Sequence, residues 1–399
     1  MRQKIIKLDY DGRGIVYVDG KITFIPKVLP EEEVEFSILE ENKHYNLAEG
    51  TVISESEERI PSVCPYYDVC DGCQFFHVSR KTELEIKKKA LEEQLSRIGY
   101  TNSIEVVAVN DLEYRNKVTL KVQNGKFGYY QSKSHNFIPI EKCLLLNSFI
   151  SDLLLDFSFF HFNNGEIMIR SNKEGELILN LITEDEFQVH DDLYKKHAIK
   201  GIIKNHEILF GEDFYNEIIN NITYQVSLNS FFQINREVAS VLFSYLKEHT
   251  MNANHILDLY CGAGAISLQL ASSNNQIIGI EVVEEAIKKA KQNAQINKIE
   301  NVTFYAGKVE HIIKKLNEQF DCIVVDPPRA GLDRFTIRFL NEQKANQLIY
   351  VSCNPKSLLR DLKLLDNYSI ELITAFDMFP KTKNMETVIV LKNSIATPR

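Results

Sequence analysis

Neither a secretory signal nor a membrane-spanning segment is expected from the 399-residue sequence. Residues 1–10 alternate charged and apolar side chains without the apolar core of a signal peptide, so we expect a cytoplasmic protein. The most apolar stretch, 143–162, contains Asp152 and Asp156 and spaces its Leu and Phe residues as a buried helix does, so no membrane partner is expected. Internal repeats and low-complexity linkers are also missing. With 44% hydrophobic and 25% charged residues, the composition excludes a mostly disordered, collagenous or coiled-coil chain.

An excess of positive charge is missing as well, because 46 Lys and Arg residues face 55 Asp and Glu residues and give a net charge of −9. Attraction of the whole molecule to nucleic acid is therefore excluded, and only a local basic face could bind RNA or DNA. The residues 87–89 are expected on a solvated helix face. The candidates for the basic face are Arg115, Lys117, Lys121, Lys381 and Lys383.

The length suggests two or three domains, and the residue pattern divides the chain into three regions. Residues 1–55 contain five short runs of strand character with an Asp-Gly hairpin turn, which predicts a small OB-like barrel. Residues 56–215 combine a cysteine-rich loop, a helix predicted at 80–98 and further strands, which indicates an α+β region. In residues 216–399 strands alternate with amphipathic helices, as in an α/β domain with a parallel sheet covered on both faces.

A glycine-rich loop follows the first predicted strand of a strand–helix series, in the sequence HILDLYCGAGA. Gly262 and Gly264 would let the backbone approach a ligand at the start of a helix beginning near Ala265, although a purely structural turn is the alternative. Glu281 ends the next strand, 19 residues after Gly262, where an acid can bind two ribose hydroxyls. NAD and S-adenosylmethionine both use this arrangement. Ser267 occupies the third glycine position of the NAD pattern, which favours S-adenosylmethionine.

Four further residues lie near the ends of later apolar strands. Asp326 ends the strand FDCIVV, at the sheet edge where open α/β sheets bind ligands. Arg329 stands where amino-group methyltransferases carry an aromatic residue, which argues against amine methylation. Cys353 precedes a predicted helix whose N-terminus would lower the pKa of its thiol, and a buried core cysteine is the alternative. Glu386 precedes the final apolar strand and is either a general base or a solvated charge.

Four of the seven cysteines have the spacing of a metal site. Cys64, Cys70 and Cys73 lie within ten residues of one loop, and Cys143 follows 70 residues after Cys73. Disulfides are not expected in a cytoplasmic protein, whereas four thiolates suit either zinc or an iron–sulfur cluster. The spacing alone does not decide between the two metals.

Five motifs together resemble the RNA (uracil-5-)-methyltransferases, a family that acts on transfer RNA and 23S ribosomal RNA. They are FFQIN at 231–235, DLYCGAG at 258–264, DPPRAGLD at 326–333, SCNP at 352–355 and MET at 385–387. The implied fold is α/β. A Rossmann-like S-adenosylmethionine-dependent methyltransferase domain would span 216–399, an OB-like TRAM β-barrel 1–55, and a central iron–sulfur domain 56–215. The resemblance also implies that the helix at 80–98 packs on the catalytic domain.

The resemblance assigns individual roles as well. It makes Cys353 the nucleophile and Glu386 the base. The residues that would bind S-adenosylmethionine are Gln233, Tyr260, Ala265, Glu281, Lys308 and Asp326, together with the loop residues Gly262 and Gly264. The metal ligands would be Cys64, Cys70, Cys73 and Cys143, holding a [4Fe–4S] cluster, with zinc as the alternative.

These assignments predict a monomeric enzyme that methylates carbon 5 of a uridine in RNA, with 23S ribosomal RNA favoured and transfer RNA possible. The flipped base would lie between apolar walls, for which Phe231, Phe232 and Tyr260 are candidates. Two other classes are considered. A non-catalytic iron–sulfur RNA-binding protein would not need Cys353 together with Glu386, and a dehydrogenase would need neither Cys353 nor the Pro-Pro pair.

Overall fold

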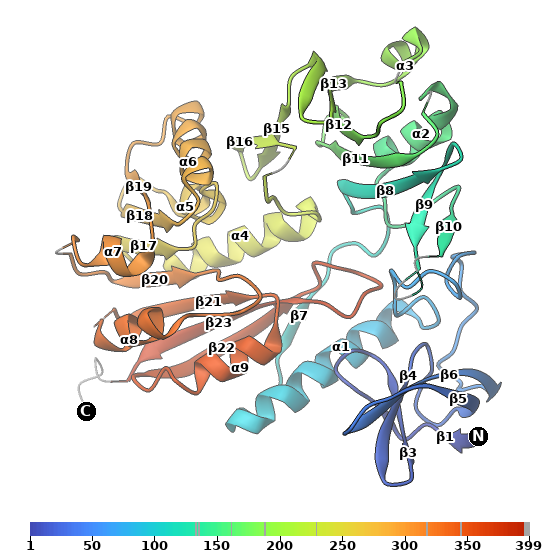
Figure 1. Ribbon diagram of the computed structural model, residues 1–399. Helices are drawn as coiled ribbons and strands as arrows, with labels where there is room; N and C mark the ends of the chain where they lie inside the picture. The colour runs from blue at the N-terminus through green and yellow to red at the C-terminus, as the bar shows by residue number, and fades with distance from the viewer. Residues whose placement is uncertain are drawn as a thin grey trace. The chain divides into compact units, whose positions relative to one another are not determined.

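The computed structural model describes residues 1–394 except 132, 133, 135, 161, 187, 188, 229, 317 and 344 (Figure 1). Contacts divide the chain into two compact units. Unit 1 comprises Met1–Val106 and Phe379–Met385, and unit 2 comprises Val107–Met378 and Glu386–Arg399. Among the described residues, none of the helices combines the length and the apolar content needed to cross a membrane.

Unit 1 begins with a six-stranded sheet in the order β1-β5-β6-β4-β3-β2. Neighbouring strands are antiparallel except β4 and β6, which are parallel. Val16, Ile25 and Val34 belong to the apolar cluster that these strands bury. The strands are β1 (Arg2–Lys4), β2 (Lys7–Leu8), β3 (Gly14–Val18), β4 (Lys21–Ile25), β5 (Glu33–Glu41) and β6 (Tyr45–Ser54). The strands expected in residues 1–55 are therefore present.

A helix follows the cysteine-rich loop where the sequence predicts it. α1 (Arg80–Leu95) continues as the 3₁₀ turn η1 (Ser96–Ile98). Ser79 caps the helix by accepting a hydrogen bond from the backbone N–H of Thr82, and Gly99 ends it with a φ of 84°.

The division into two units differs from the domain boundaries expected at 55 and 215. Leu29 from the N-terminal sheet region packs with Phe75 and Val78, and Ile86 of α1 packs against the same cluster. This apolar packing joins the cysteine-rich loop and α1 to the N-terminal sheet, and α1 belongs to unit 1.

Unit 2 contains a seven-stranded sheet in the order β10-β9-β8-β11-β12-β13-β14. Its strands are β8 (Lys117–Gln123), β9 (Lys126–Tyr130), β10 (Phe137–Pro139), β11 (Gly165–Ser171), β12 (Leu177–Ile182), β13 (Ile199–Lys204) and β14 (Glu207–Gly211). The helices α2 (Ser148–Leu155) and α3 (Asp191–Lys196) and the 3₁₀ turn η2 (Phe157–Phe159) lie between these strands in the chain. The hairpin of β15 (Phe214–Ile219) and β16 (Ile222–Ser227) leads to the next sheet.

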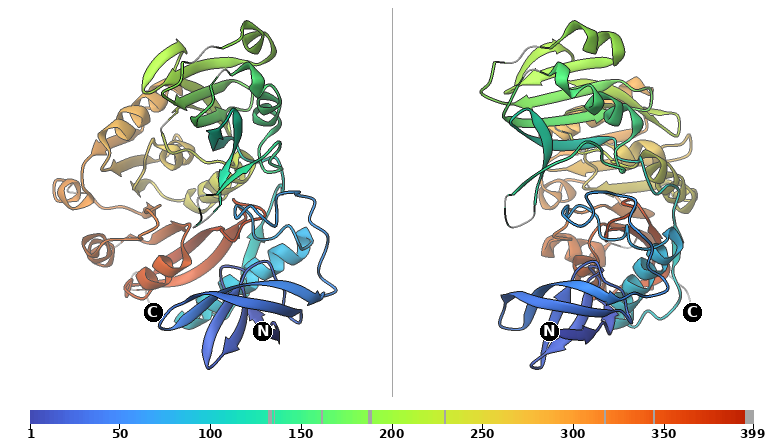
Figure 2. Two further views of the ribbon diagram at one scale, coloured as in Figure 1. Left: turned by 45° about the vertical axis from the view of Figure 1, so that its right-hand side comes forward. Right: turned by 90° about the vertical axis from the view of Figure 1, so that its right-hand side faces the viewer.

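An eight-stranded sheet carries the strand–helix alternation, in the order β19-β18-β17-β20-β21-β23-β22-β7. Its strands are β7 (Glu105–Val107), β17 (His255–Leu259), β18 (Gln276–Glu281), β19 (Val302–Ala306), β20 (Cys322–Val325), β21 (Gln347–Ser352), β22 (Tyr368–Phe376) and β23 (Glu386–Asn393). The strands from β19 to β21 are parallel, and β23 is antiparallel to both of its neighbours. Figure 2 shows the seven- and eight-stranded sheets of unit 2 as separate groups of strands.

The helices that belong to the eight-stranded sheet lie between its strands in the chain (Figure 1). They are α4 (Arg236–Thr250), α5 (Ala265–Leu270), α6 (Glu284–Ile296), α7 (Val309–Ile313), α8 (Arg334–Glu342) and α9 (Pro355–Leu362). β20 is buried along its whole length, as expected for a central parallel strand. The predicted α/β architecture is thus confirmed, with the ends of β17, β18, β20 and β21 at one edge of a single sheet.

Candidate active site

The glycine-rich loop makes a tight turn between β17 and α5. Tyr260 has a φ of 65°, Gly262 of 54° and Gly264 of 80°, so three residues within five adopt the left-handed conformation. A Cβ atom at Gly264 would lie 2.8 Å from the ring of Phe304, whereas one at Gly262 would meet nothing within 4 Å. Gly264 is therefore needed for close packing, and Gly262 leaves open space beside the loop.

The carboxylate of Glu281 is oriented by two backbone N–H groups at the end of β18. Gly262 donates to Oε2 at 3.3 Å and Val283 donates to Oε1 at 2.9 Å. These bonds fix the acid against the glycine-rich loop and retain oxygen lone pairs for a ligand. The position agrees with the ribose-binding role predicted for Glu281.

A cavity of about 370 Å³ opens next to this loop, within the usual size range of small-ligand sites. Six of the eight residues predicted to bind the cofactor line it: Gln233, Tyr260, Gly262, Ala265, Glu281 and Asp326. Gly264 is not among its lining residues and instead precedes the first turn of α5. Lys308 is exposed before α7 and is also outside this lining. The cavity thus fits a cofactor of nucleoside size held by an acid and a glycine-rich loop.

The loop after β20 brings Asp326 to the cavity and Arg329 toward the strand end of β21. Burial raises the pKa of Asp326 to about 7. Its backbone N–H donates to the carbonyl of Leu259 at 3.4 Å, and the side chain of Asn354 donates to the carbonyl of Arg329 at 2.8 Å. These bonds tie both ends of the Asp326–Arg329 turn to neighbouring elements of the sheet.

Cys353 and Glu386 lie across from one another at adjoining strand ends. In the antiparallel pair of β21 and β23, Ser352 pairs with Thr387. The next step of the same register would set Cys353 opposite Glu386, and the charge of Glu386 acts on the pKa of the Cys353 thiol. Cys353 is half-buried and Glu386 is buried. The sheet therefore brings together a thiol and a carboxyl that are 33 residues apart in the sequence.

The electrostatics of these groups differ from the sequence expectation. Burial, together with the nearby Glu386 and Asp326, raises the pKa of the Cys353 thiol, while a hydrogen bond and the charge of Arg329 oppose that rise. The lowered thiol pKa expected from the following helix is therefore wrong for this arrangement, because desolvation and two acids outweigh the helix N-terminus. Burial and Asp326 likewise raise the pKa of Glu386 well above its usual range.

Two residues that the sequence reasoning did not assign contribute to this site. Arg329 makes a hydrogen bond to Cys353, and its positive charge favours the ionised forms of Cys353 and Glu386. Asp258 is fully buried under the glycine-rich loop, where its carboxylate accepts a hydrogen bond from Ser267 and its pKa is raised to about 7 by burial. An arginine directly after a Pro-Pro pair and an acid inside an apolar strand were the available sequence signals.

The four cysteines predicted as metal ligands are divided between the two units. Cys64, Cys70 and Cys73 belong to unit 1, and Cys143 belongs to unit 2. Across the residues described, no group of three or more His, Cys, Asp or Glu side chains is placed to hold a metal ion. The metal site predicted from the cysteine spacing therefore stays a prediction, and no catalytic step depends on it.

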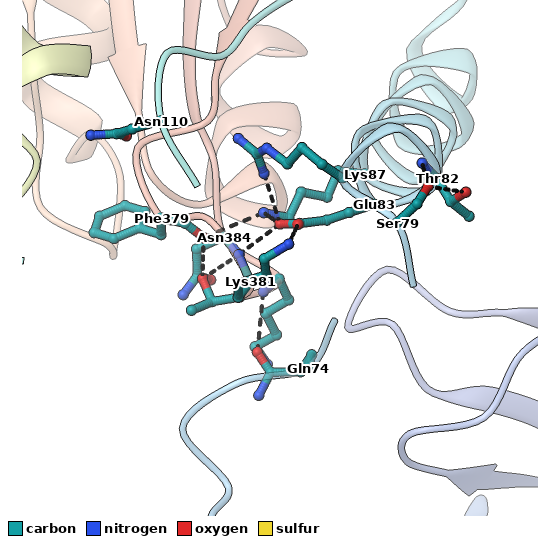
Figure 3. Close-up of polar contacts among 12 residues, drawn as sticks. Gln74, Ser79, Thr82, Glu83, Lys87, Asn110, Phe379, Lys381 and Asn384 are labelled. Carbon is teal, nitrogen blue, oxygen red and sulfur yellow. Dashed lines mark hydrogen bonds and ion pairs between the residues drawn. The ribbon is translucent and has the colours of Figure 1, made fainter. Parts of the chain in front are cut away.

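The predicted basic face is only partly available. Lys381 is buried against Glu83, and Lys383 bonds to Asp11 at 2.8 Å. Lys121 pairs with Glu166. Lys87, predicted to be solvated, is also buried, and Figure 3 shows it pointing toward Glu83. These ammonium groups neutralise acids of the same chain.

The two phenylalanines predicted as apolar walls for the base differ in their exposure to solvent. The side chain of Phe232 is buried and its ring packs 5.3 Å from that of Tyr224, centroid to centroid. Phe231 is 80% exposed at the mouth of the same cavity. Phe231 is thus the accessible candidate for stacking on a base, and Phe232 is a core residue.

Comparisons with known proteins show the family to which the chain belongs. The family model described as tRNA (uracil-5-)-methyltransferase matches residues 184–394. RNA methyltransferases of Halalkalibacterium halodurans and Listeria monocytogenes are 31% and 32% identical, each over 96% of this chain and 95% of the relative. The crystal structure of Pyrococcus abyssi tRNA (uracil-54, C5)-methyltransferase with S-adenosyl-L-homocysteine has a TM-score of 0.80 and 26% identity, covering 98% of this chain and 100% of that one. The chain therefore belongs to the tRNA (uracil-5-)-methyltransferase family of RNA methyltransferases.

Proposed function

We propose that this enzyme methylates carbon 5 of a uridine in 23S ribosomal RNA, using S-adenosylmethionine. The observation that carries the proposal is the pairing of Cys353 with Glu386 at adjoining strand ends, next to the cavity that Glu281 and Asp326 line. Neither residue alone would define the chemistry. Together they supply the nucleophile and the base that substitution at carbon 5 of uracil requires.

The thiolate of Cys353 adds to carbon 6 of the uracil, which places enolate charge on the ring and makes carbon 5 nucleophilic. When bound, S-adenosylmethionine supplies an electrophilic methyl group on its sulfonium sulfur. As carbon 5 attacks this methyl group, the sulfur–methyl bond breaks and its electron pair stays on the sulfur. Carbon 5 then carries both the new methyl group and its original proton. Glu386 removes that proton, the electron pair reforms the carbon 5–carbon 6 double bond, and the Cys353 sulfur leaves as thiolate.

The local charges suit this sequence of steps. Burial keeps Glu386 and Asp326 among low-dielectric surroundings, so both have raised pKa values. A carboxylate with a raised pKa is a stronger base once it is ionised. Arg329 favours the ionised forms of Cys353 and Glu386, and we assign it the role of electrostatic support for both.

Transfer RNA is the second candidate substrate, because the solved structure with the TM-score of 0.80 is that of a tRNA enzyme. The ribosomal target rests on the cysteine spacing, which resembles that of the family members that contain an iron–sulfur cluster and methylate 23S ribosomal RNA. Mapping 5-methyluridine in ribosomal and transfer RNA of a deletion strain distinguishes them. Loss of a 5-methyluridine from 23S RNA alone supports the proposal, and loss from transfer RNA alone replaces it with the second candidate.

Glu281→Ala is expected to weaken binding of S-adenosylmethionine by about 10- to 150-fold, because hydrogen bonds to a charged acceptor contribute roughly 1.5–3 kcal/mol. Titration calorimetry with S-adenosylhomocysteine measures the change. Glu284→Ala is the matched control, since Glu284 is exposed three residues later and pairs with Lys288 at 3.5 Å. Equal affinity of Glu281→Ala and wild-type protein would contradict the assignment of this cavity.

We also propose that Cys64, Cys70, Cys73 and Cys143 bind a [4Fe–4S] cluster, on the evidence of their spacing in the sequence. Protein purified without oxygen should be brown, contain about four irons per chain and lose them in Cys143→Ser. Cys322→Ala, which alters a buried thiol of β20, should keep its iron. A colourless protein with one zinc would refute the cluster and leave the zinc alternative.

A further inference from the structure

Glu83 on α1 is a fully buried carboxylate surrounded by cations of unit 1 (Figure 3). Its Oε1 lies 2.8 Å from the Nζ of Lys87 and 3.1 Å from a guanidinium nitrogen of Arg80. Its Oε2 lies 3.2 Å from the Nζ of Lys381. Burial alone would raise the pKa of Glu83, but the three cations hold it below its usual value. The carboxylate is therefore charged in the interior.

Glu83 also binds the backbone of the segment Phe379–Met385, which we call the base-leading loop. The backbone N–H of Lys381 donates to Oε1 of Glu83 at 2.7 Å. The ammonium of Lys87, itself paired with Glu83, donates to the carbonyl of Phe379 at 3.3 Å. One buried acid thus fixes two backbone positions of this loop, one directly and one through its lysine.

The cysteine-rich loop holds the same segment from its other side. The carbonyl of Lys381 accepts hydrogen bonds from the backbone N–H groups of Gln74 at 2.8 Å and of Phe75 at 3.1 Å. The side-chain oxygen of Gln74 accepts a further bond from the N–H of Lys383 at 3.1 Å. Every one of these partners belongs to unit 1, so unit 1 holds the loop although its flanking strands belong to unit 2.

The backbone conformation of Lys381 explains why the loop needs these hydrogen bonds and this ion pair. Lys381 has a φ of 63°, a left-handed conformation that a residue with a Cβ atom adopts only when its surroundings enforce it. Here the N–H, the carbonyl and the ammonium of this single residue are all engaged. Removing the charge of Glu83 would leave the buried ammonium groups of Lys87 and Lys381 without this charged partner. Lys381 would then be able to leave its left-handed conformation.

The base-leading loop ends at the buried Met385, and the next residue in the chain is Glu386. We propose that Glu83 is a positioning residue that sets the placement of the general base through this loop. This inference rests on the proposed function of Glu386. It assigns a role in the reaction to a residue of α1, 303 positions earlier in the chain.

A change in the placement of Glu386 should slow one particular step of the reaction. A displaced base slows removal of the carbon 5 proton, whereas addition of Cys353 and transfer of the methyl group precede that step. Misplacement by about 1 Å costs on the order of 10²-fold in rate. Glu83→Gln should therefore lower multiple turnover by about 10²-fold and accumulate methylated RNA bound to Cys353. Loss of folding alone would reduce all steps together and accumulate no adduct.

The test measures turnover, the single-turnover burst and the adduct on a denaturing gel for Glu83→Gln in the full-length protein. Glu85→Gln is the matched control, because Glu85 lies on the same helix, is exposed and pairs with Lys81 only at 3.9 Å. The control should turn over as wild type without adduct. Lys381→Met, which keeps the backbone bonds of the loop but removes its ammonium, should show a smaller version of the Glu83→Gln effect.

Glu386→Gln is measured in parallel to separate the two hypotheses. If Glu386→Gln traps an adduct and Glu83→Gln turns over normally, the positioning role is refuted while the proposed function stands. If Glu386→Gln turns over normally and forms no adduct, the proposed function fails and the inference fails with it. Should Glu83→Gln not fold, Lys381→Met decides: an adduct supports the positioning role, and wild-type turnover overturns it.

Discussion

Cys353→Ala is expected to bind RNA and S-adenosylmethionine normally and to transfer no methyl group. Without the sulfur no bond to carbon 6 forms, and carbon 5 remains too weakly nucleophilic to attack the methyl donor. The loss should be on the order of 10⁴- to 10⁶-fold, the size seen when a catalytic nucleophile is removed. Transfer of a radiolabelled methyl group to RNA measures it, and filter binding verifies that the RNA still binds.

Cys322→Ala is the matched control, because Cys322 is a second thiol of the same sheet, buried on β20. It should retain methyl transfer. Because the pKa of the Cys353 thiol is raised, the thiolate fraction increases with pH, and the single-turnover rate of wild-type enzyme should rise across roughly pH 7–9. Normal turnover by Cys353→Ala would refute the nucleophile assignment.

Glu386→Gln is expected to stop the reaction at a later step than Cys353→Ala does. Addition of Cys353 and methyl transfer can still occur, but the amide cannot accept the carbon 5 proton, so the sulfur cannot leave. The variant should stop after about one methyl group per enzyme, with multiple turnover reduced on the order of 10²- to 10⁴-fold. A denaturing gel should show protein and labelled RNA migrating together.

Protease digestion and mass spectrometry should locate the RNA bond at Cys353. The double variant carrying Cys353→Ala and Glu386→Gln should form no adduct, which ties the slow band to that sulfur. Glu371→Gln on the neighbouring strand β22, where Glu371 pairs with Lys392 at the surface, should behave as wild type. If Glu386→Gln turns over normally and leaves no adduct, another group is the base.

Much of the fold could be predicted because its signals are local in sequence. The α1–η1 helix lies where the sequence predicts it, and Ser79 and Gly99 cap its ends through contacts within a few residues. The parallel strands were visible as short apolar runs followed by polar or glycine residues. For the same reason Asp326 and Cys353 could be placed at one sheet edge before their contacts were known.

The features that could not be predicted depend on partners distant in the sequence. Lys87 reads as part of a solvated lysine run, yet it is buried because it pairs with Glu83 and bonds Phe379, 292 residues away. Lys381 reads as an RNA contact, yet its backbone bonds Glu83 across 298 residues. The pKa of Cys353 was misjudged because the helix after it is local, whereas Glu386 and Asp326 are not.

The insertion of β23 between β21 and β22 has a consequence for biosynthesis. The ribosome makes β21 and β22 first, and both strands wait with unpaired edges until residues 386–393 emerge and fill the gap between them. The same residues begin with Glu386. A chain interrupted before this point would expose two apolar strand edges and lack its base, so it would be open to aggregation and proteolysis. Completion of the sheet and acquisition of catalytic competence are therefore a single event in the maturation of the nascent chain.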